Sequence, residues 1–180
     1  MAEEQKKRRG RRAYLDNYKA LANGEIVYTG RVYSWSGSAP WNRELSFLWL
    51  CAGLSGVCVA VCGVLPVSGM MNTFYVIVPW LLAFIGAGAT VWALCRMTHH
   101  GERMEEHVLK ATVGALPVRA AFTAVCAAAA VLGQAMCLIV NGTGPAFWAD
   151  VSFFPLMAEA AVAAALLYPR GKALRFEIRP

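Results

Sequence analysis

One stretch without charged residues constrains the fold of this chain more than any other feature. No Asp, Glu, Lys or Arg occurs between Leu45 and Cys95. A soluble core segment rarely runs that far without a charge, whereas a membrane helix needs about 20 consecutive apolar residues. The stretch is divided by "PVSGMMN", whose Pro, Gly and Asn interrupt helices. We therefore expect two membrane spans, at 45–65 and 73–95.

A second pair of apolar segments follows at 120–140 and 151–168, on either side of "NGTGPAFWAD". The last segment is short, but its length is still within the range of a lightly tilted helix. The predicted fold class is therefore an all-α integral membrane protein, a four-helix bundle spanning 45–168.

The distribution of basic residues predicts the orientation of the bundle. Cytoplasmic loops retain Lys and Arg, while translocated loops carry few. All 17 basic residues lie before the first span, in the loop 96–119 or in the segment 169–180. Both termini are therefore expected in the cytoplasm, and the short outer loops favour a bacterial plasma membrane.

The first segment, 1–12, is too polar to pack and is expected to be a disordered basic tail. Basic side chains beside a membrane attract anionic lipid headgroups by about 1 kcal/mol each. We assign this lipid contact to Lys6, Lys7, Arg8, Arg9, Arg11 and Arg12. Nucleic-acid binding is the alternative, but topology already accounts for the charge.

The segment 13–44 is expected to hold a juxtamembrane helix followed by strands. Aromatic and leucine side chains recur at helical spacing from Tyr14 to Leu21, and Gly24 suits the end of a helix. "EIVYTGRVYSW" is rich in β-branched and aromatic residues, and "ALRFEIRP" alternates apolar with charged residues. Because an isolated hairpin is marginally stable, we expect a small cytoplasmic β cluster formed by the two termini.

The cytoplasmic loop 96–119 predicts an amphipathic surface helix between spans two and three. It would begin near Glu102, pair Glu106 with Lys110 one turn later and end at Pro117. Its apolar face would consist of Met104, Val108, Ala111 and Ala115. The histidines of this loop lack the spacing of a metal site and are expected to be solvated.

The sequence lacks the usual marks of catalysis. Its six cysteines all lie within or at the ends of the spans, and none forms a Cys-x-x-Cys pair. No phosphate-binding loop, metalloprotease motif or glycine-framed nucleophile occurs. We therefore expect no enzymatic activity, no metal and no cofactor.

A faint internal echo suggests a duplicated helical hairpin. The pattern Phe-x3-Cys-x10-Cys occurs in the first span and again, 75 positions later, in the third. The six residues are Phe47, Cys51, Cys62, Phe122, Cys126 and Cys137. Chance in an alanine- and cysteine-rich chain is the alternative to duplication.

Glu159 is the one charged residue inside any predicted span. A charge near the bilayer centre costs about 2.5 kcal/mol or more, so it should face the bundle interior and find a partner. Gln134 and Glu159 fall about 9 and 12 Å below the outer ends of spans three and four, at 1.5 Å per residue. We expect a hydrogen bond between them that fixes the register of these spans. The alternative is a proton or cation site, with Pro155 and Pro79 loosening the adjoining helices.

These features predict a non-catalytic accessory or regulatory subunit of a larger membrane assembly, with a membrane protein or a second copy as partner. The alternative is a small proton- or cation-coupled transporter that uses Glu159. Four short spans with one membrane carboxylate resemble the small multidrug-resistance exporters in architecture. Those exporters carry their glutamate in the first helix and lack the cytoplasmic segments present here.

Overall fold

A computed structural model describes residues 18–20, 26–142 and 145–178 of the chain. The basic tail 1–12 and the beginning of the helix expected from Tyr14 lie outside the described residues.

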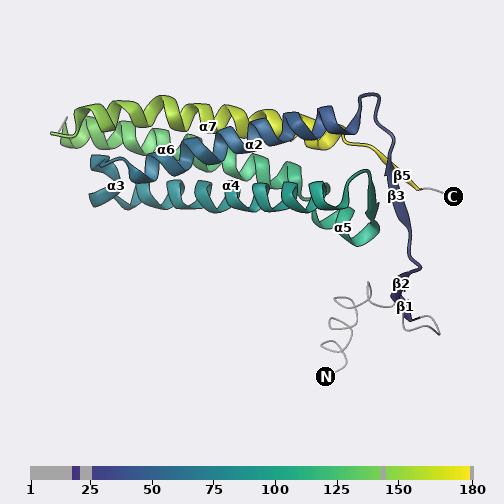
Figure 1. Ribbon diagram of the computed structural model, residues 1–180. Helices are drawn as coiled ribbons and strands as arrows, with labels where there is room; N and C mark the ends of the chain where they lie inside the picture. The colour runs from purple at the N-terminus through teal and green to yellow at the C-terminus, as the bar shows by residue number, and fades with distance from the viewer. Residues whose placement is uncertain (1–17, 21–25, 143–144, 179–180) are drawn as a thin grey trace, which may run out of the picture.

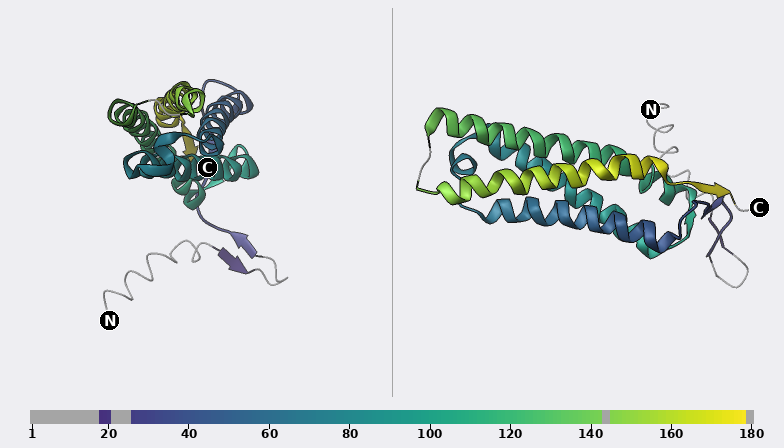
Figure 2. Two further views of the ribbon diagram at one scale, coloured as in Figure 1. Left: turned by 90° about the vertical axis from the view of Figure 1, so that its left-hand side faces the viewer. Right: turned by 90° about the horizontal axis from the view of Figure 1, so that it is seen from above.

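Four long helices form an antiparallel bundle (Figure 1). They are α2 (Trp41–Val64), α4 (Phe74–His100), α6 (Leu116–Asn141) and α7 (Phe147–Ala173). Each helix packs against two neighbours in the cyclic order α2, α4, α6, α7, as the end-on view in Figure 2 shows. Four segments, one containing each of these helices, are long and apolar enough to cross a membrane. The prediction of four spans is confirmed at this level.

The helices extend beyond the predicted spans except at the end of α2 and the start of α4, which each fall one residue short. α2 begins four residues before Leu45, and α7 runs from Phe147 to Ala173 instead of 151–168. Helical hydrogen bonding continues past the apolar segment. Hydropathy therefore locates the apolar part of each helix but not the ends of the helix.

A three-stranded sheet lies at one end of the bundle, which we call the sheet end. β3 (Val32–Trp35) is its central strand, flanked by β4 (Arg103–Glu105) and β5 (Phe176–Ile178), and both pairings are antiparallel. Tyr33 lies opposite Met104 on one side and Ile178 on the other. The sheet thus joins segments that precede α2, follow α4 and follow α7.

Two short strands replace part of the helix expected near the N-terminus. β1 (Tyr18–Ala20) pairs with β2 (Ile26–Tyr28) in antiparallel register. The helical spacing at residues 18–20 is therefore misleading. Pairing with β2 satisfies backbone N–H and C=O groups that a single helical turn would leave without partners.

The loop 96–119 also differs from the predicted surface helix. Residues 103–105 form β4, and the helix α5 (Glu106–Ala111) has only six residues. The expected pair is present, with Lys110 Nζ 2.6 Å from Glu106 Oε1. Pro117 does not end a helix; it lies in the first turn of α6, where its missing N–H costs nothing.

The core consists of two clusters of buried apolar side chains. The cluster at the sheet end contains Trp41, and Trp35 and Phe176 pack against it. The ring centroids of these three aromatic residues are 5.3–5.7 Å apart, so the sheet is fastened to the first turn of α2. The other cluster fills the opposite end, which we call the loop end, where the short helix α3 (Ser68–Asn72) lies between α2 and α4.

The burial pattern agrees with a duplicated hairpin. Buried positions of α2 recur 75 positions later as buried positions of α6. The matched pairs are Trp41 and Leu116, Leu48 and Thr123, Cys51 and Cys126, Ala52 and Ala127, Ser55 and Ala130, Val59 and Gln134, and Cys62 and Cys137. α4 and α7 each have 27 residues, and each is followed after two residues by a strand that pairs with β3. The two hairpins thus share these buried positions and the same order of long helix, long helix and strand.

Candidate functional site

Glu159 lies at the middle of α7, and its side chain is exposed on the surface of the bundle. The buried stripe of α7 has helical spacing and consists of Asp150, Phe153, Met157, Ala160, Ala163, Ala164, Leu167 and Gly171. Glu159 falls between two members of this stripe and is out of phase with it. The carboxylate therefore points away from the bundle interior.

The surroundings of Glu159 are almost entirely apolar. Its one recorded polar contact is with Cys58 of α2, whose thiol donates to Glu159 Oε2 over 3.9 Å. The exposed neighbours on α7 are Pro155 one turn before it, and Val162 and Leu166 after it, with Val162 60% exposed. None of the ion pairs among the described residues involves Glu159. The site is an uncompensated carboxylate on an apolar surface.

The structure does not bring Gln134 to Glu159. Gln134 Nε2 instead donates to Asp150 Oδ1 over 3.0 Å, and both side chains are fully buried. The expected hydrogen bond between Gln134 and Glu159 does not form, because similar depths along the two helices do not bring together side chains that point in different directions. Gln134 faces the interior, while Glu159 faces outward.

Asp150 also fastens the short helix α3. The backbone N–H and the hydroxyl of Ser68 both donate to Asp150 Oδ1, each over 2.8 Å. Ser68 is the first residue of α3, and Val67 at its N-cap makes no side-chain hydrogen bond. Asp150 therefore caps α3 from another helix, and one carboxyl oxygen joins α3, α6 and α7.

Two oxygen atoms of this cluster are buried without a partner: Gln134 Oε1 and Asp150 Oδ2. Gln134 Oε1 lies against Gly69, where a Cβ atom would come within 2.1 Å of it. The sequence contained a signal for this cluster, because Asp150 precedes Phe153 by three residues and continues the buried stripe of α7. Hydropathy does not reveal the cluster, because the apolar segment begins at Val151, one residue after Asp150.

The two predicted helix-loosening prolines lie in different environments. Pro79 lies within α4 and has no N–H to donate to the Tyr75 carbonyl. That carbonyl faces Gly133 of α6, where a Cβ atom would approach it to 2.4 Å. Pro155 is exposed on α7, one turn before Glu159. Pro79 thus lies at a tight helix contact, and Pro155 lies on the surface that carries the carboxylate.

The helices enclose one hollow that is too small to hold a water molecule. The enclosed hollow between the two core clusters has a volume of about 0 Å³ for a water-sized sphere. Its lining consists of Ala52, Ser55, Ala87, Thr90, Ala120, Thr123, Ala164 and Leu167. A groove of about 560 Å³ near the sheet end is open to the surface between α2 and α4, where Trp49 Nε1 donates to Thr98 Oγ1 over 2.9 Å. Neither Asp150 nor Glu159 lines either of these two hollows.

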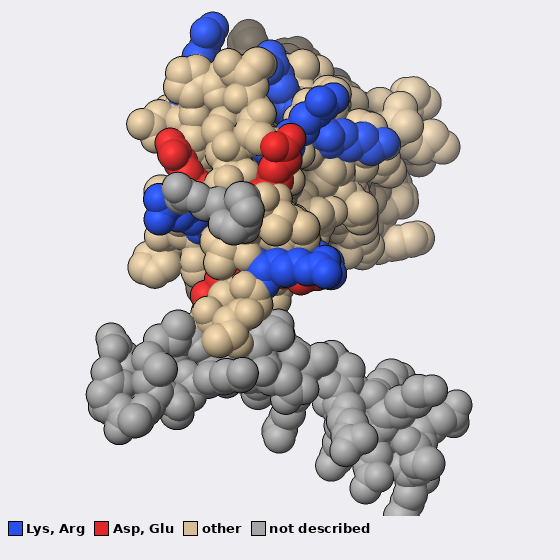
Figure 3. All heavy atoms as spheres, turned by 90° about the vertical axis from the view of Figure 1, so that its right-hand side faces the viewer, with Lys and Arg blue, Asp and Glu red and all other residues tan. Residues whose placement is uncertain are grey.

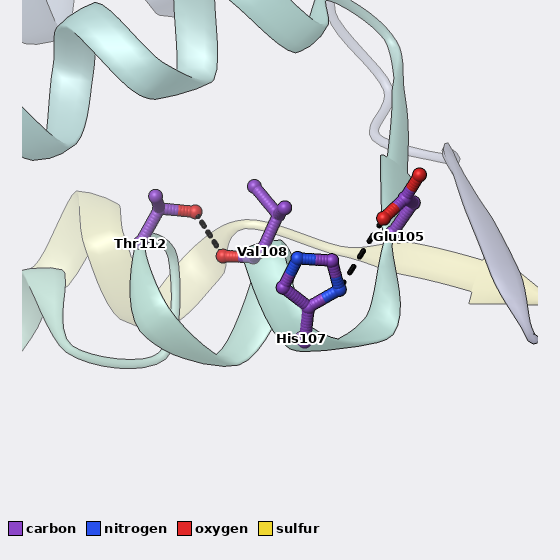
Figure 4. A network of polar contacts seen from close by, with 4 residues as sticks. All are labelled: Glu105, His107, Val108 and Thr112. Atoms are coloured by element: carbon purple, nitrogen blue, oxygen red, sulfur yellow. Dashed lines mark hydrogen bonds and ion pairs between the residues drawn. The ribbon is translucent and has the colours of Figure 1, made fainter. Parts of the chain in front are cut away.

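Charged side chains gather at the sheet end, where Figure 3 shows Lys and Arg together with Asp and Glu on this face of the molecule. Glu105 of β4 and His107 of α5 point toward each other, with His107 Nδ1 3.3 Å from Glu105 Oε2 (Figure 4). In the same view Thr112 Oγ1 donates to the Val108 carbonyl over 2.7 Å. Among the described residues, no group of three or more His, Cys, Asp or Glu could hold a metal ion.

Comparison with known proteins adds no further constraint. No protein-family model, no curated protein and no solved structure matches this chain.

Proposed function

We propose that this protein is a non-catalytic membrane subunit that joins a larger assembly through the Glu159 face of α7. We define this face as Pro155, Glu159, Val162 and Leu166, which are all exposed on α7. The partner is a transmembrane helix of a different protein that carries a Lys or Arg at the same depth.

One observation supports this proposal above the others: a carboxylate at the middle of an apolar helix is exposed rather than buried. A charge facing lipid at mid-membrane costs about 2.5 kcal/mol or more. A thiol 3.9 Å away recovers little of that cost. A basic side chain from a neighbouring helix would remove the cost, since a paired charge in a membrane is stabilised by its partner.

A second copy of this chain is a poorer partner than a different protein. In a two-fold contact the same face meets itself, so Glu159 would approach another Glu159. None of the 17 Lys and Arg residues lies between Leu45 and Cys95, between Ala120 and Tyr168, or in either loop between paired helices. A second copy therefore brings no cation to the depth of Glu159, and charge complementarity favours a partner that does.

Transport through a single bundle has weaker support. Intramembrane carboxylates of transporters face the interior or a water-filled cavity. Glu159 points outward, and the enclosed hollow has no room for water.

The orientation belongs to the same proposal. We place both termini and the sheet end in the cytoplasm of a bacterial cell, because basic residues are absent from the loops of the other end. The basic tail 1–12 would then contact anionic headgroups beside the sheet, which leaves the apolar flank of α7 free for the partner.

Site-specific photocrosslinking in intact membranes tests the proposal. A photoreactive amino acid at Val162, which is 60% exposed beside Glu159, is expected to form an adduct with one different membrane protein. The matched control is Ile85, which is 56% exposed near the middle of α4 and should not form this adduct. Glu159→Lys should abolish the adduct at Val162.

Charge reversal then identifies the contact. Replacing the partner's intramembrane Lys or Arg by Glu should restore the adduct to Glu159→Lys, because the pair is rebuilt with opposite polarity. An adduct between two copies of this chain, or equal adducts from Val162 and Ile85, would contradict the proposal.

A further inference from the structure

The loop end holds a second carboxyl group that the proposed docking face does not use. Asp150 is fully buried, and its two carboxyl oxygens differ in the number of hydrogen bonds that they accept. Oδ1 accepts three hydrogen bonds, from the Ser68 N–H, the Ser68 hydroxyl and Gln134 Nε2. Oδ2 accepts none. An ionised carboxylate carries equal charge on both oxygens and would attract donors to both.

Among the described residues of the helices around Asp150, no positive charge lies near enough to compensate an ionised form. The described parts of α3, and the loop-end halves of α2, α4 and α6, carry no Asp, Glu, Lys or Arg. The titratable side chains that these elements contribute in the loop-end cluster are Cys58 and Cys62 on α2, Tyr75 on α4 and Cys137 on α6. Glu159, on the same helix, is nine residues away, or about 13 Å along the axis. Burying a charge without a counter-charge costs several kcal/mol.

The other atom without a partner is Gln134 Oε1, on the amide whose Nε2 already donates to Asp150. An amide and a carboxylic acid are complementary: the amide N–H donates to one carboxyl oxygen while the acid O–H donates to the amide oxygen. The first of these two hydrogen bonds is present at 3.0 Å. The second needs one hydrogen on Asp150 Oδ2.

We propose that Asp150 and Gln134 form a binding site for a single proton, carried on Asp150 Oδ2 and donated to Gln134 Oε1. This proton gives both partnerless oxygens a hydrogen bond and removes the buried charge. It leaves Asp150 Oδ1 as the acceptor that caps α3 through Ser68. The protonated site therefore holds α3, which connects α2 to α4, against α6 and α7.

Infrared spectroscopy of the purified protein in lipid tests the assignment directly. At neutral pH the wild type should show the C=O band of a protonated carboxylic acid, which shifts in heavy water. Asp150→Asn should lose this band, whereas the control Glu159→Gln should keep it. Gln134→Leu removes the acceptor of the acid O–H, so the band should move in frequency without disappearing.

Thermal unfolding provides a second measurement. Asp150→Asn should keep the melting temperature of the wild type, because its amide can donate to Gln134 Oε1 and accept from Ser68 and Gln134 Nε2. Asp150→Ala should lower it. The absence of any acid band that depends on Asp150 would overturn the proposal, as would a band unchanged by Gln134→Leu. Stabilisation of the wild type but not Asp150→Asn by Na⁺ or K⁺ over choline would also overturn it, since Asp150 would then be ionised around a metal cation.

Discussion

The polar side chains of the bundle differ in the direction in which they point from their helices more than in their depth along the helices. Gln134 and Asp150 lie in phase with the buried stripes of α6 and α7, and Glu159 does not. The sequence pattern places Gln134 and Glu159 within spans but leaves Asp150 in the outer loop, and only the helical phase counted back from Phe153 puts Asp150 on the buried face of α7. The identity of what covers Glu159 was beyond sequence, because lipid and a partner helix select the same apolar neighbours.

At the residue scale we expect truncation of Gln134 to destabilise the protein much more than truncation of Glu159. Gln134→Ala should lower the free energy of unfolding in detergent by about 1–3 kcal/mol, since it leaves buried polar atoms of Asp150 unpaired. Glu159→Ala should change it by less than about 0.5 kcal/mol, because the exposed carboxylate has only a weak thiol contact. The measurement is thermal or denaturant unfolding of both variants side by side. A larger loss for Glu159→Ala would mean that its contact with Cys58 matters within the monomer.

At the scale of elements, apolar segments were predictable and their ends were not. The charge-free stretch from Leu45 to Cys95 locates α2 and α4, since a helix satisfies all its backbone hydrogen bonds within one segment in lipid. Residues 103–105 read as part of a helix because Met104 and Val108 share a helical face. They form β4 because β3 offers an open edge, and a pairing of distant segments leaves no local periodicity.

Close packing between helices depends on glycine at particular positions. Gly133 of α6 faces the Tyr75 carbonyl of α4, which Pro79 deprives of its usual helical donor. Gly133→Ala should destabilise the protein by about 1–3 kcal/mol, because the added Cβ would have to displace backbone. The control is Gly88→Ala on α4, where an added Cβ meets nothing within 4 Å. Unfolding measurements that show equal effects would argue against this helix contact.

At the scale of the whole molecule, the bundle leaves most of its apolar surface uncovered. Between 28% and 39% of the most apolar window of each candidate span is buried within the protein, so lipid or partner helices must cover the rest. α2 and α6, the first helices of the two hairpins, bury equivalent positions. Their surfaces differ, however, because only the second hairpin exposes a carboxylate.

Cysteine accessibility tests how the molecule crosses the membrane. In a Cys95→Ser background, which removes the one native thiol described as exposed, Asn141→Cys should react with a membrane-impermeant maleimide added to intact cells. Lys172→Cys should react only after the membrane is opened. Asn141 follows the apolar part of α6 at the loop end, and Lys172 lies in the last turn of α7 at the sheet end. The reverse pattern of labelling would invert the proposed orientation.

The three-stranded sheet imposes an order on biosynthesis. β3 is made before the first long helix, β4 after the second and β5 after the fourth. Until α7 has been made and inserted, β3 therefore keeps an unpaired edge, which is a template for wrong pairing or for a chaperone. Closure by β5 brings Phe176 against Trp35 and Trp41, so the sheet becomes complete only when all four helices are in place. A complete sheet can therefore form only after the last of the four long helices has been made.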